Sequence, residues 1–161
     1  YVLPEDKLDG MLVYTADKNG EGDRYFCKDG KIQRESDDGS RDSRYPKEDD
    51  HELDVPLAVL VNGNSASASE VFTGAVMDYD AGIVVGTTTF GKGIVQNLIP
   101  LGDGTAIKLT TAHYYTPNGF DLHGKGLEPD VVVEMDEELQ KKAVVELSED
   151  NQLQAAIEAM N

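Results

Sequence analysis

The chain has 161 residues, 39% of them hydrophobic and 28% charged, so it is long enough to bury the core of one domain. Its 31 acidic and 14 basic side chains give a formal net charge of −17, which disfavours nucleic acid and anionic membrane surfaces as partners. No apolar run approaches the ~20 residues of a membrane span, so we expect no membrane insertion. Cys27 is the single cysteine, and an intrachain disulfide is therefore excluded.

The first third of the chain is expected to hold one short strand followed by turns and a loop. Residues 11–15 (MLVYT) have the composition of a strand. Asp17, Asn19 and Glu21 partly match a calcium loop, but Lys28 stands where its bidentate glutamate belongs, so a hairpin turn is expected there. Residues 28–54 are almost wholly polar and predict a long acidic loop insert, with a lid over a site as the functional alternative.

The middle of the chain predicts a strand–helix–strand unit. Residues 55–62 (VPLAVLVN) form a continuous apolar run typical of a strand buried on both faces. Apolar side chains then recur at helical spacing over residues 68–79, and residues 83–85 predict the next strand. A parallel pair with a right-handed crossover is expected. Ser67 and Glu70 have the spacing of a capping box at the start of the helix.

The last third is expected to open with a β-hairpin. Two strand-like segments, residues 93–101 and 105–116, are joined by Gly-Asp-Gly at 102–104, a tight-turn signal. Residues 131–135 (VVVEM) predict a last strand, and residues 136–160 are expected to be helical.

Gly86, Gly91 and Lys92 have the spacing of a phosphate-binding loop. Such a loop needs a serine or threonine after the lysine to ligate magnesium, and then a helix whose N-terminus faces the phosphates. Here Gly93 follows Lys92, and the next residues are β-branched and end in Pro100. The pattern therefore disfavours a nucleotide site.

Ser67 lies where a buried strand turns into a helix, next to N–H groups that would favour a developing oxyanion. A nucleophilic serine also needs a base. His51, His113 and His123 lie in the acidic loop, a predicted strand and an HGKG segment, and we expect them to be structural or on the surface. A lysine can act as the base when it is neutral, and the glycines flanking Lys92 would let its backbone enter a tight place. Ser–Lys pairs of this kind are known, whereas a helix cap is the alternative role of Ser67.

A resemblance to a known family rests on four segments between residues 57 and 134. They are NGNSASASEVFTGAVMDY, VVGTTTFGKGIVQ, LGDGTAIKLTTAHYYTPNG and GKGLEPDVVVE. Together and in this order they resemble the carboxyl-terminal processing (tail-specific) serine peptidases. The resemblance implies that Ser67 is the nucleophile and Lys92 the general base. It also implies that Gln96 orients the lysine by a hydrogen bond, and that the backbone N–H of Ala68 is an oxyanion donor.

The resemblance further implies an α/β fold, a ClpP/crotonase-like core built from β-β-α units. The PDZ domain and the first half of the core, which the family normally has, are not visible in residues 1–161. We therefore expect the C-terminal part of a peptidase catalytic domain, with little or no activity by itself. An incomplete core would also expose surfaces that favour a homodimer or strand exchange.

The function implied is that of a serine endopeptidase that cleaves proteins near exposed, mostly apolar C-termini. The resemblance implies a location outside the cytoplasm, which is the periplasm, the cell envelope, the extracellular space or the thylakoid lumen. No metal or cofactor is expected. Two alternatives stay open from the residues. One is a non-catalytic binding module on the same fold, in which Ser67 only caps the helix, and the other is the disfavoured nucleotide-binding domain.

Overall fold

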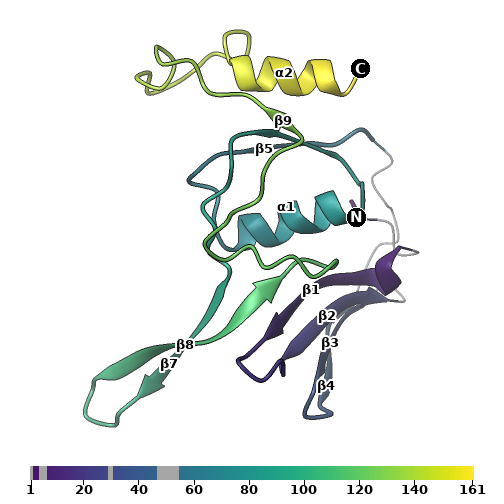
Figure 1. Ribbon diagram of the computed structural model, residues 1–161, viewed down its shortest axis with the longest axis vertical. Helices are drawn as coiled ribbons and strands as arrows, with labels where there is room; N and C mark the ends of the chain where they lie inside the picture. Colours follow the sequence, from purple (N-terminus) through teal and green to yellow (C-terminus); the bar gives the residue numbers. More distant parts are fainter. Residues whose placement is uncertain (1, 4–6, 29–30, 47–54) are drawn as a thin grey trace.

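The computed structural model describes residues 2–161 except 4–6, 29–30 and 47–54. The described chain forms an antiparallel sheet, a smaller parallel sheet, two α-helices and one short 3-10 helix (Figure 1). In chain order the elements are η1 (Leu8–Gly10), β1 (Met11–Ala16), β2 (Asp23–Lys28), β3 (Lys31–Ser36), β4 (Arg41–Pro46), β5 (Ala58–Val61), α1 (Ala68–Asp78), β6 (Ile83–Gly86), β7 (Ile94–Pro100), β8 (Ala106–Tyr115), β9 (Val131–Val132) and α2 (Asn151–Ala159).

The larger sheet has six strands in the order β4-β3-β2-β1-β8-β7, and every neighbouring pair is antiparallel. Residues 87–93, between β6 and β7, contain Lys92 and are called the lysine loop. The expected hairpin after this loop is confirmed as β7–β8, whose turn projects away from the rest of the molecule (Figure 1). The pairing of β1 with β8 brings together segments about 100 residues apart, with Thr15 opposite Tyr114. This long-range pairing joins the N-terminal strands to the hairpin that follows Lys92.

The expectation of a loop over residues 28–54 is wrong for two segments, because β3 and β4 form a hairpin there. β3 pairs along its whole length with β2, and Arg34 forms an ion pair with Asp23 on that strand at 2.9 Å. These cross-strand contacts supply the order that the low hydrophobicity of the segment does not predict. Residues 47–54, the rest of the expected loop, lie outside the described residues.

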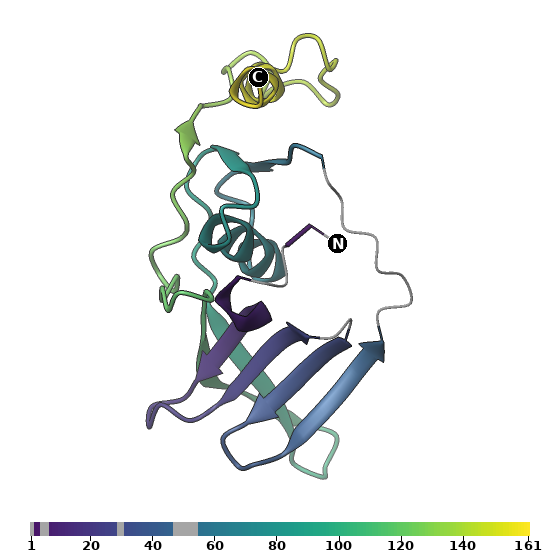
Figure 2. The same ribbon diagram turned by 90° about the vertical axis from the view of Figure 1, so that its right-hand side faces the viewer.

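The smaller sheet confirms the predicted strand–helix–strand unit. β5 and β6 are parallel, with Val59 opposite Val84, and α1 makes the crossover between them. Helix α1 lies on one face of this sheet and α2 on the other (Figures 1 and 2). Val76 of α1 and Val84 and Val85 of β6 are fully buried, and each contributes about 1.5–3 kcal/mol of hydrophobic stabilisation.

The expected helical segment at residues 136–160 is shorter in the structure, because α2 comprises only Asn151–Ala159. Its start is set by the carboxylate of Asp150, which accepts hydrogen bonds from the N–H groups of Gln152 and Leu153 at 3.0 and 2.9 Å. The Asn151 side chain donates to the carbonyl of Glu134 at 2.7 Å, so the two ends of the segment before α2 lie close together. Residues 137–149 consequently form turns instead of a continuous helix.

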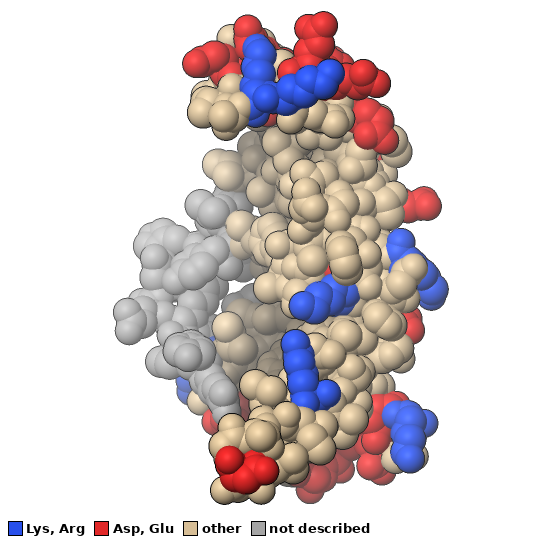
Figure 3. Space-filling view, turned by 90° about the vertical axis from the view of Figure 1, so that its left-hand side faces the viewer, with Lys and Arg blue, Asp and Glu red and all other residues tan. Residues whose placement is uncertain are grey.

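The negative charge is unevenly distributed along the chain. Residues 56–127, which include the predicted site residues, contain five acidic and three basic side chains. On the face shown in Figure 3, acidic side chains gather at the α2 end and at the opposite end of the molecule. Neither helix of the described residues is long and apolar enough to cross a bilayer.

Candidate active site

Ser67 lies in the turn between β5 and α1, directly before the first residue of the helix. Its backbone has φ 58° and ψ −114°, a combination that side-chain-bearing residues rarely adopt and that costs of order 1–3 kcal/mol. The turn is held by internal hydrogen bonds, including Ser65 N–H to the carbonyl of Asn62 at 2.8 Å. Ala68 opens the helix, so no carbonyl within the helix accepts its N–H. The strand-to-helix turn expected at Ser67 is therefore present.

The carboxylate of Glu70 is fully buried and joins this turn to the lysine loop. It accepts hydrogen bonds from the N–H of Ser67 at 2.9 Å and from the N–H of Lys92 at 2.8 Å. It also accepts the N–H of Gly91 and the hydroxyl of Thr89, both at 2.6 Å. Bonds to a charged acceptor are worth about 1.5–3 kcal/mol each, so Glu70 is a strong link between two segments that are 22 residues apart.

The sequence predicted only a capping role for Glu70, and the structure confirms the capping box that it forms with Ser67. Glu70 reaches back to the N–H of Ser67. The Ser67 side chain in turn lies against the Glu70 N–H, which also donates to the Ser67 carbonyl at 2.9 Å. The capping-box spacing was the only sequence signal for this carboxylate, and nothing in the local sequence pointed to Thr89 as its partner.

The lysine loop packs directly against the backbone of residues 122–127. Gly91 has φ 84°, and a Cβ there would lie 2.9 Å from the backbone nitrogen of Gly126. The N–H of Gly124 donates to the carbonyl of Gly91 at 2.9 Å, and the N–H of Leu127 donates to Thr89 Oγ1 at 2.8 Å. The glycine thus allows a close approach of two loops. Strand β7 follows almost at once, so the helix required after a phosphate-binding loop is absent at these described residues.

The side chains of Lys92 and Gln96 are both exposed. Gln96 Nε2 donates to Thr110 Oγ1 at 3.2 Å on the neighbouring strand β8. Among the hydrogen bonds of the described residues, none joins Lys92 Nζ to Ser67 Oγ or to Gln96. The structure therefore brings the backbones of Ser67 and Lys92 onto one carboxylate, and the roles of the three side chains stay predictions.

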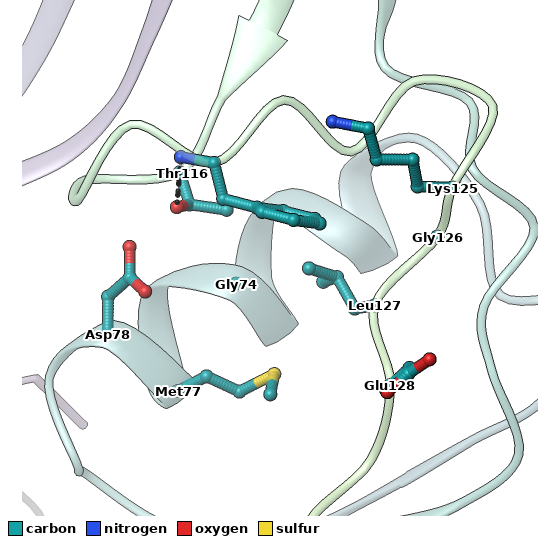
Figure 4. A pocket seen from close by; sticks show the side chains of 9 residues that line it. Gly74, Met77, Asp78, Thr116, Lys125, Gly126, Leu127 and Glu128 are labelled. Carbon is teal, nitrogen blue, oxygen red and sulfur yellow. Dashed lines mark hydrogen bonds between the residues drawn. The ribbon is translucent and has the colours of Figure 1, made fainter.

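Two cavities lie along α1, and the smaller one contains the predicted nucleophile. Ser67 and Ala68 line a cavity of about 340 Å³ between the start of α1 and the larger sheet. A cavity of about 530 Å³ lies between the second half of α1 and the segment after β8, where Lys125 lies over the ring of Phe120 (Figure 4). None of the predicted site residues lines it, so the larger of the two cavities is not the one at the predicted nucleophile.

The described histidines lie on the far side of the sheet from Ser67. Tyr114 lines the cavity at Ser67, and neighbouring residues of a strand face opposite sides, so His113 points the other way. There it contacts Asp121 at 3.3 Å and the ring of His123, with centroids 4.8 Å apart. Burial would raise the pKa of Asp121, but hydrogen bonds from the His123 N–H and from His113 lower it overall. His51 lies outside the described residues.

No group of three or more histidine, cysteine, aspartate or glutamate side chains within the described residues could hold a metal ion.

Curated relatives match about half of the chain. It is 54% identical over 79 residues to a carboxy-terminal-processing protease of Bartonella bacilliformis, which covers 49% of this chain and 18% of that protein. It is 52% identical over 80 residues to a probable CtpA-like serine protease of Staphylococcus epidermidis, and the match covers 50% of this chain and 16% of that protein. The chain thus spans less than a fifth of the length of these relatives.

Solved structures agree with the fold. The photosystem II D1 C-terminal processing protease matches with a TM-score of 0.58 and 36% identity, over 78% of this chain and 28% of that one. A putative S41 protease of Bacteroides fragilis matches with a TM-score of 0.62 over 99% of this chain and 38% of that one, but at 14% identity it supports the fold alone. The mixed α/β fold with its partial core is therefore that of S41 protease structures. The sequence model of peptidase family S41 matches residues 7–133, and the chain accordingly belongs to this family.

Proposed function

We propose that the protein is a serine endopeptidase in which Ser67 is the nucleophile and Lys92 the general base. The observation that carries the proposal is the shared carboxylate of Glu70, which accepts the backbone N–H groups of both residues. It holds the turn of a strained serine at a helix N-terminus beside the loop of the lysine. Membership of peptidase family S41 supports the same reading.

In the proposed reaction, the Ser67 hydroxyl attacks the carbonyl carbon of the scissile peptide bond while the neutral amine of Lys92 takes its proton. The N–H of Ala68, at the start of α1, stabilises the negative charge on the carbonyl oxygen. The Lys92 ammonium then protonates the leaving amine as the C–N bond breaks, which leaves Ser67 acylated. A water, deprotonated by Lys92, hydrolyses this ester and restores the hydroxyl.

The lysine must be neutral and close to Ser67 for these steps. Its backbone is held by Glu70, so rotation about the side-chain torsions of Lys92 is the movement that brings Nζ to the serine. Gln96 is proposed to orient the amine once its amide leaves Thr110. A neutral amide suits this role, because a carboxylate in its place would favour the charged form of the lysine.

The proposed substrates are proteins with exposed, mostly apolar C-termini, cleaved near those ends outside the cytoplasm. The names of the relatives, a carboxy-terminal-processing protease and the D1 C-terminal processing protease, support this assignment. Because the chain spans 18% of the Bartonella bacilliformis relative, residues 1–161 by themselves are proposed to have little or no peptidase activity.

The test measures cleavage of peptides that end in an apolar tail. It compares Ser67→Ala and Lys92→Ala with the wild type, each made in the intact protein, meaning a chain of the relatives' length that contains residues 1–161. Each variant should lower kcat by at least about 10³-fold, as removal of a nucleophile or its base does. Ser69→Ala and Lys108→Ala, which change the same residue types at exposed positions, are the matched controls. Cleavage at the wild-type rate in Ser67→Ala would overturn the assignment of Ser67 as the nucleophile, whereas binding of these peptides by the wild type without any cleavage would favour a binding module.

A further inference from the structure

The larger of the two cavities, about 530 Å³ between the second half of α1 and the segment after β8, has no part in the proposed reaction. Its walls are mainly apolar, with Met77, Phe120 and Leu127 among the side chains that line it (Figure 4). Gly74 contributes bare backbone to the wall, and a Cβ there would lie 2.7 Å from Thr116 Cγ2. The middle of the cavity therefore favours apolar groups of a ligand.

Charged side chains lie at both ends of this cavity. Figure 4 shows Asp78 at one end and Lys125 and Glu128 at the other. Lys125 Nζ lies 5.1 Å from the centre of the Phe120 ring, and no ion pair between described residues includes Lys125. Although the chain has 31 acidic side chains, this ammonium is thus available to the carboxylate of a ligand.

The carboxylate at the opposite end is available to a donor. Asp78 Oδ2 accepts the N–H of Asn118 at 2.7 Å, and the second oxygen of a carboxylate can accept a further hydrogen bond. The cavity therefore combines an apolar middle with an anion at one end and a cation at the other. A ligand with an ammonium, an apolar middle and a carboxylate is complementary to this arrangement.

One wall of the cavity also supports the lysine loop. The N–H of Leu127 donates to Thr89 Oγ1 at 2.8 Å, and the N–H of Thr89 donates to the carbonyl of Leu127 at 3.1 Å. The Thr89 hydroxyl in turn donates to the carboxylate of Glu70 at 2.6 Å. A ligand that restrains Leu127 would consequently restrain the lysine loop.

We propose that this cavity binds a short apolar peptide with free ends, with its carboxylate at Lys125 and its ammonium at Asp78, and that the bound peptide restrains the lysine loop through Leu127. Such a peptide is the class of product that cleavage near an apolar C-terminus releases, so the choice of ligand rests on the proposed function. The volume of about 530 Å³ lies within the range of ~300–1,000 Å³ that is usual for ligand pockets.

The experiment uses Ser67→Ala in the intact protein, so that no ligand is cleaved. Isothermal titration calorimetry compares the tripeptide Leu-Ala-Leu with its C-amidated and N-acetylated forms. Blocking either end should raise Kd by about 2–5-fold, as expected for loss of an ion pair that water can reach. Adding Lys125→Gln should abolish the preference over the amidated form, and adding Asp78→Asn the preference over the acetylated form. Lys108→Gln, at an exposed position on β8, should keep both preferences.

A photo-crosslinking form of the tripeptide, in which a diazirine replaces the branch of one leucine, locates the bound peptide. After irradiation and digestion, mass spectrometry should find the label on Met77, Phe120 or Leu127, and Lys125→Gln should reduce it. Equal affinity for the free and blocked forms, or labelling confined to other parts of the intact protein, would overturn the assignment of this cavity.

Hydrogen exchange measures the effect on the lysine loop. The N–H groups of Gly91 and Lys92 should exchange about 10-fold more slowly at a peptide concentration ten times Kd, because opening of the loop then competes with binding. Adding Thr89→Val should leave binding intact but remove this protection. Binding with unchanged exchange would overturn the link to the lysine loop. Since none of these measurements requires cleavage, each of these failures would leave the proposed function of Ser67 intact.

Discussion

The carboxylate of Glu70 accepts the backbone N–H of Lys92, 22 positions later in the chain, at 2.8 Å. The same carboxylate accepts the N–H of Ser67, so one buried group fixes the relative position of the two predicted catalytic segments. Its other two donors, Thr89 and Gly91, come from the lysine loop.

Replacing Glu70 with glutamine should impair catalysis as well as stability. The amide keeps the shape of the side chain but has one acceptor oxygen in place of two, so some of the four donors lose their partner. Each buried polar group left unpaired costs about 1–3 kcal/mol, and we expect the free energy of unfolding to fall by about 2–4 kcal/mol.

Urea unfolding and peptide cleavage by the intact protein measure the two effects of Glu70→Gln. Below the unfolding transition we expect kcat to fall by about 10–100-fold while KM changes little, since the lysine loop loses its fixed position but the cavity at Ser67 remains. Glu158→Gln, at an exposed carboxylate, is the control. An unchanged kcat in folded Glu70→Gln would show that the carboxylate only caps the helix.

Thr89→Val should show how much the hydrogen bonds of the Thr89 hydroxyl contribute to stability. The threonine is buried, and its hydroxyl donates to Glu70 at 2.6 Å and accepts the N–H of Leu127 at 2.8 Å. Valine has nearly the same shape but neither function, so we expect a loss of about 1–3 kcal/mol in unfolding free energy. Thr88→Val, one position away and exposed, should change stability by less than about 0.5 kcal/mol. Equal effects at the two positions would contradict the assigned contacts.

Gly91→Ala and Gly102→Ala form a matched pair, because both glycines have a positive φ, 84° and 86°. A Cβ at Gly91 would lie 2.9 Å from the nitrogen of Gly126, whereas a Cβ at Gly102 has no neighbour within 4 Å. Both variants incur the cost of the left-handed backbone, about 1 kcal/mol, and only Gly91→Ala should add the cost of displacing a packed loop. The unfolding temperature and the cleavage rate should therefore be lower in Gly91→Ala than in Gly102→Ala. Identical losses would show that close packing at Gly91 is unimportant.

The ion pair between Arg34 and Asp23 should make stability depend on pH. The hydrogen bond from the guanidinium holds the pKa of the Asp23 carboxyl below its ordinary value of 3.8, against a smaller opposing effect of burial. Because the folded protein favours the ionised carboxyl, the stabilisation is complete well above pH 3.8 and is lost as the pH falls through and below that value. Wild type should exceed Asp23→Asn in urea midpoint at pH 7, and the gap should narrow towards pH 3. Glu158→Gln, at an exposed position on α2, should show no such pH-dependent gap.

Local sequence patterns were sufficient for the elements in the middle of the chain. The apolar run before Ser67, the helical spacing after it and the Gly-Asp-Gly turn at 102–104 predicted β5, α1, β6 and the β7–β8 hairpin. These elements form from residues close in sequence, so composition and periodicity determine them. The same reasoning was wrong for residues 31–46, where β3 pairs with β2 and β4 pairs with β3. It was also wrong for residues 136–150, where the chain forms turns before Asp150 caps α2.

The sequence by itself determined the family, through motifs at family spacing, and the position of Ser67 at a strand-to-helix turn. Only the tertiary structure decided that Glu70 is a buried link to Thr89, Gly91 and Lys92, and that β1 and β2 supply the floor beneath Ser67. The reason is physical. A hydrogen bond between segments 22 residues apart, and a strand pairing across about 100, depend on how the whole chain packs. No local propensity encodes them.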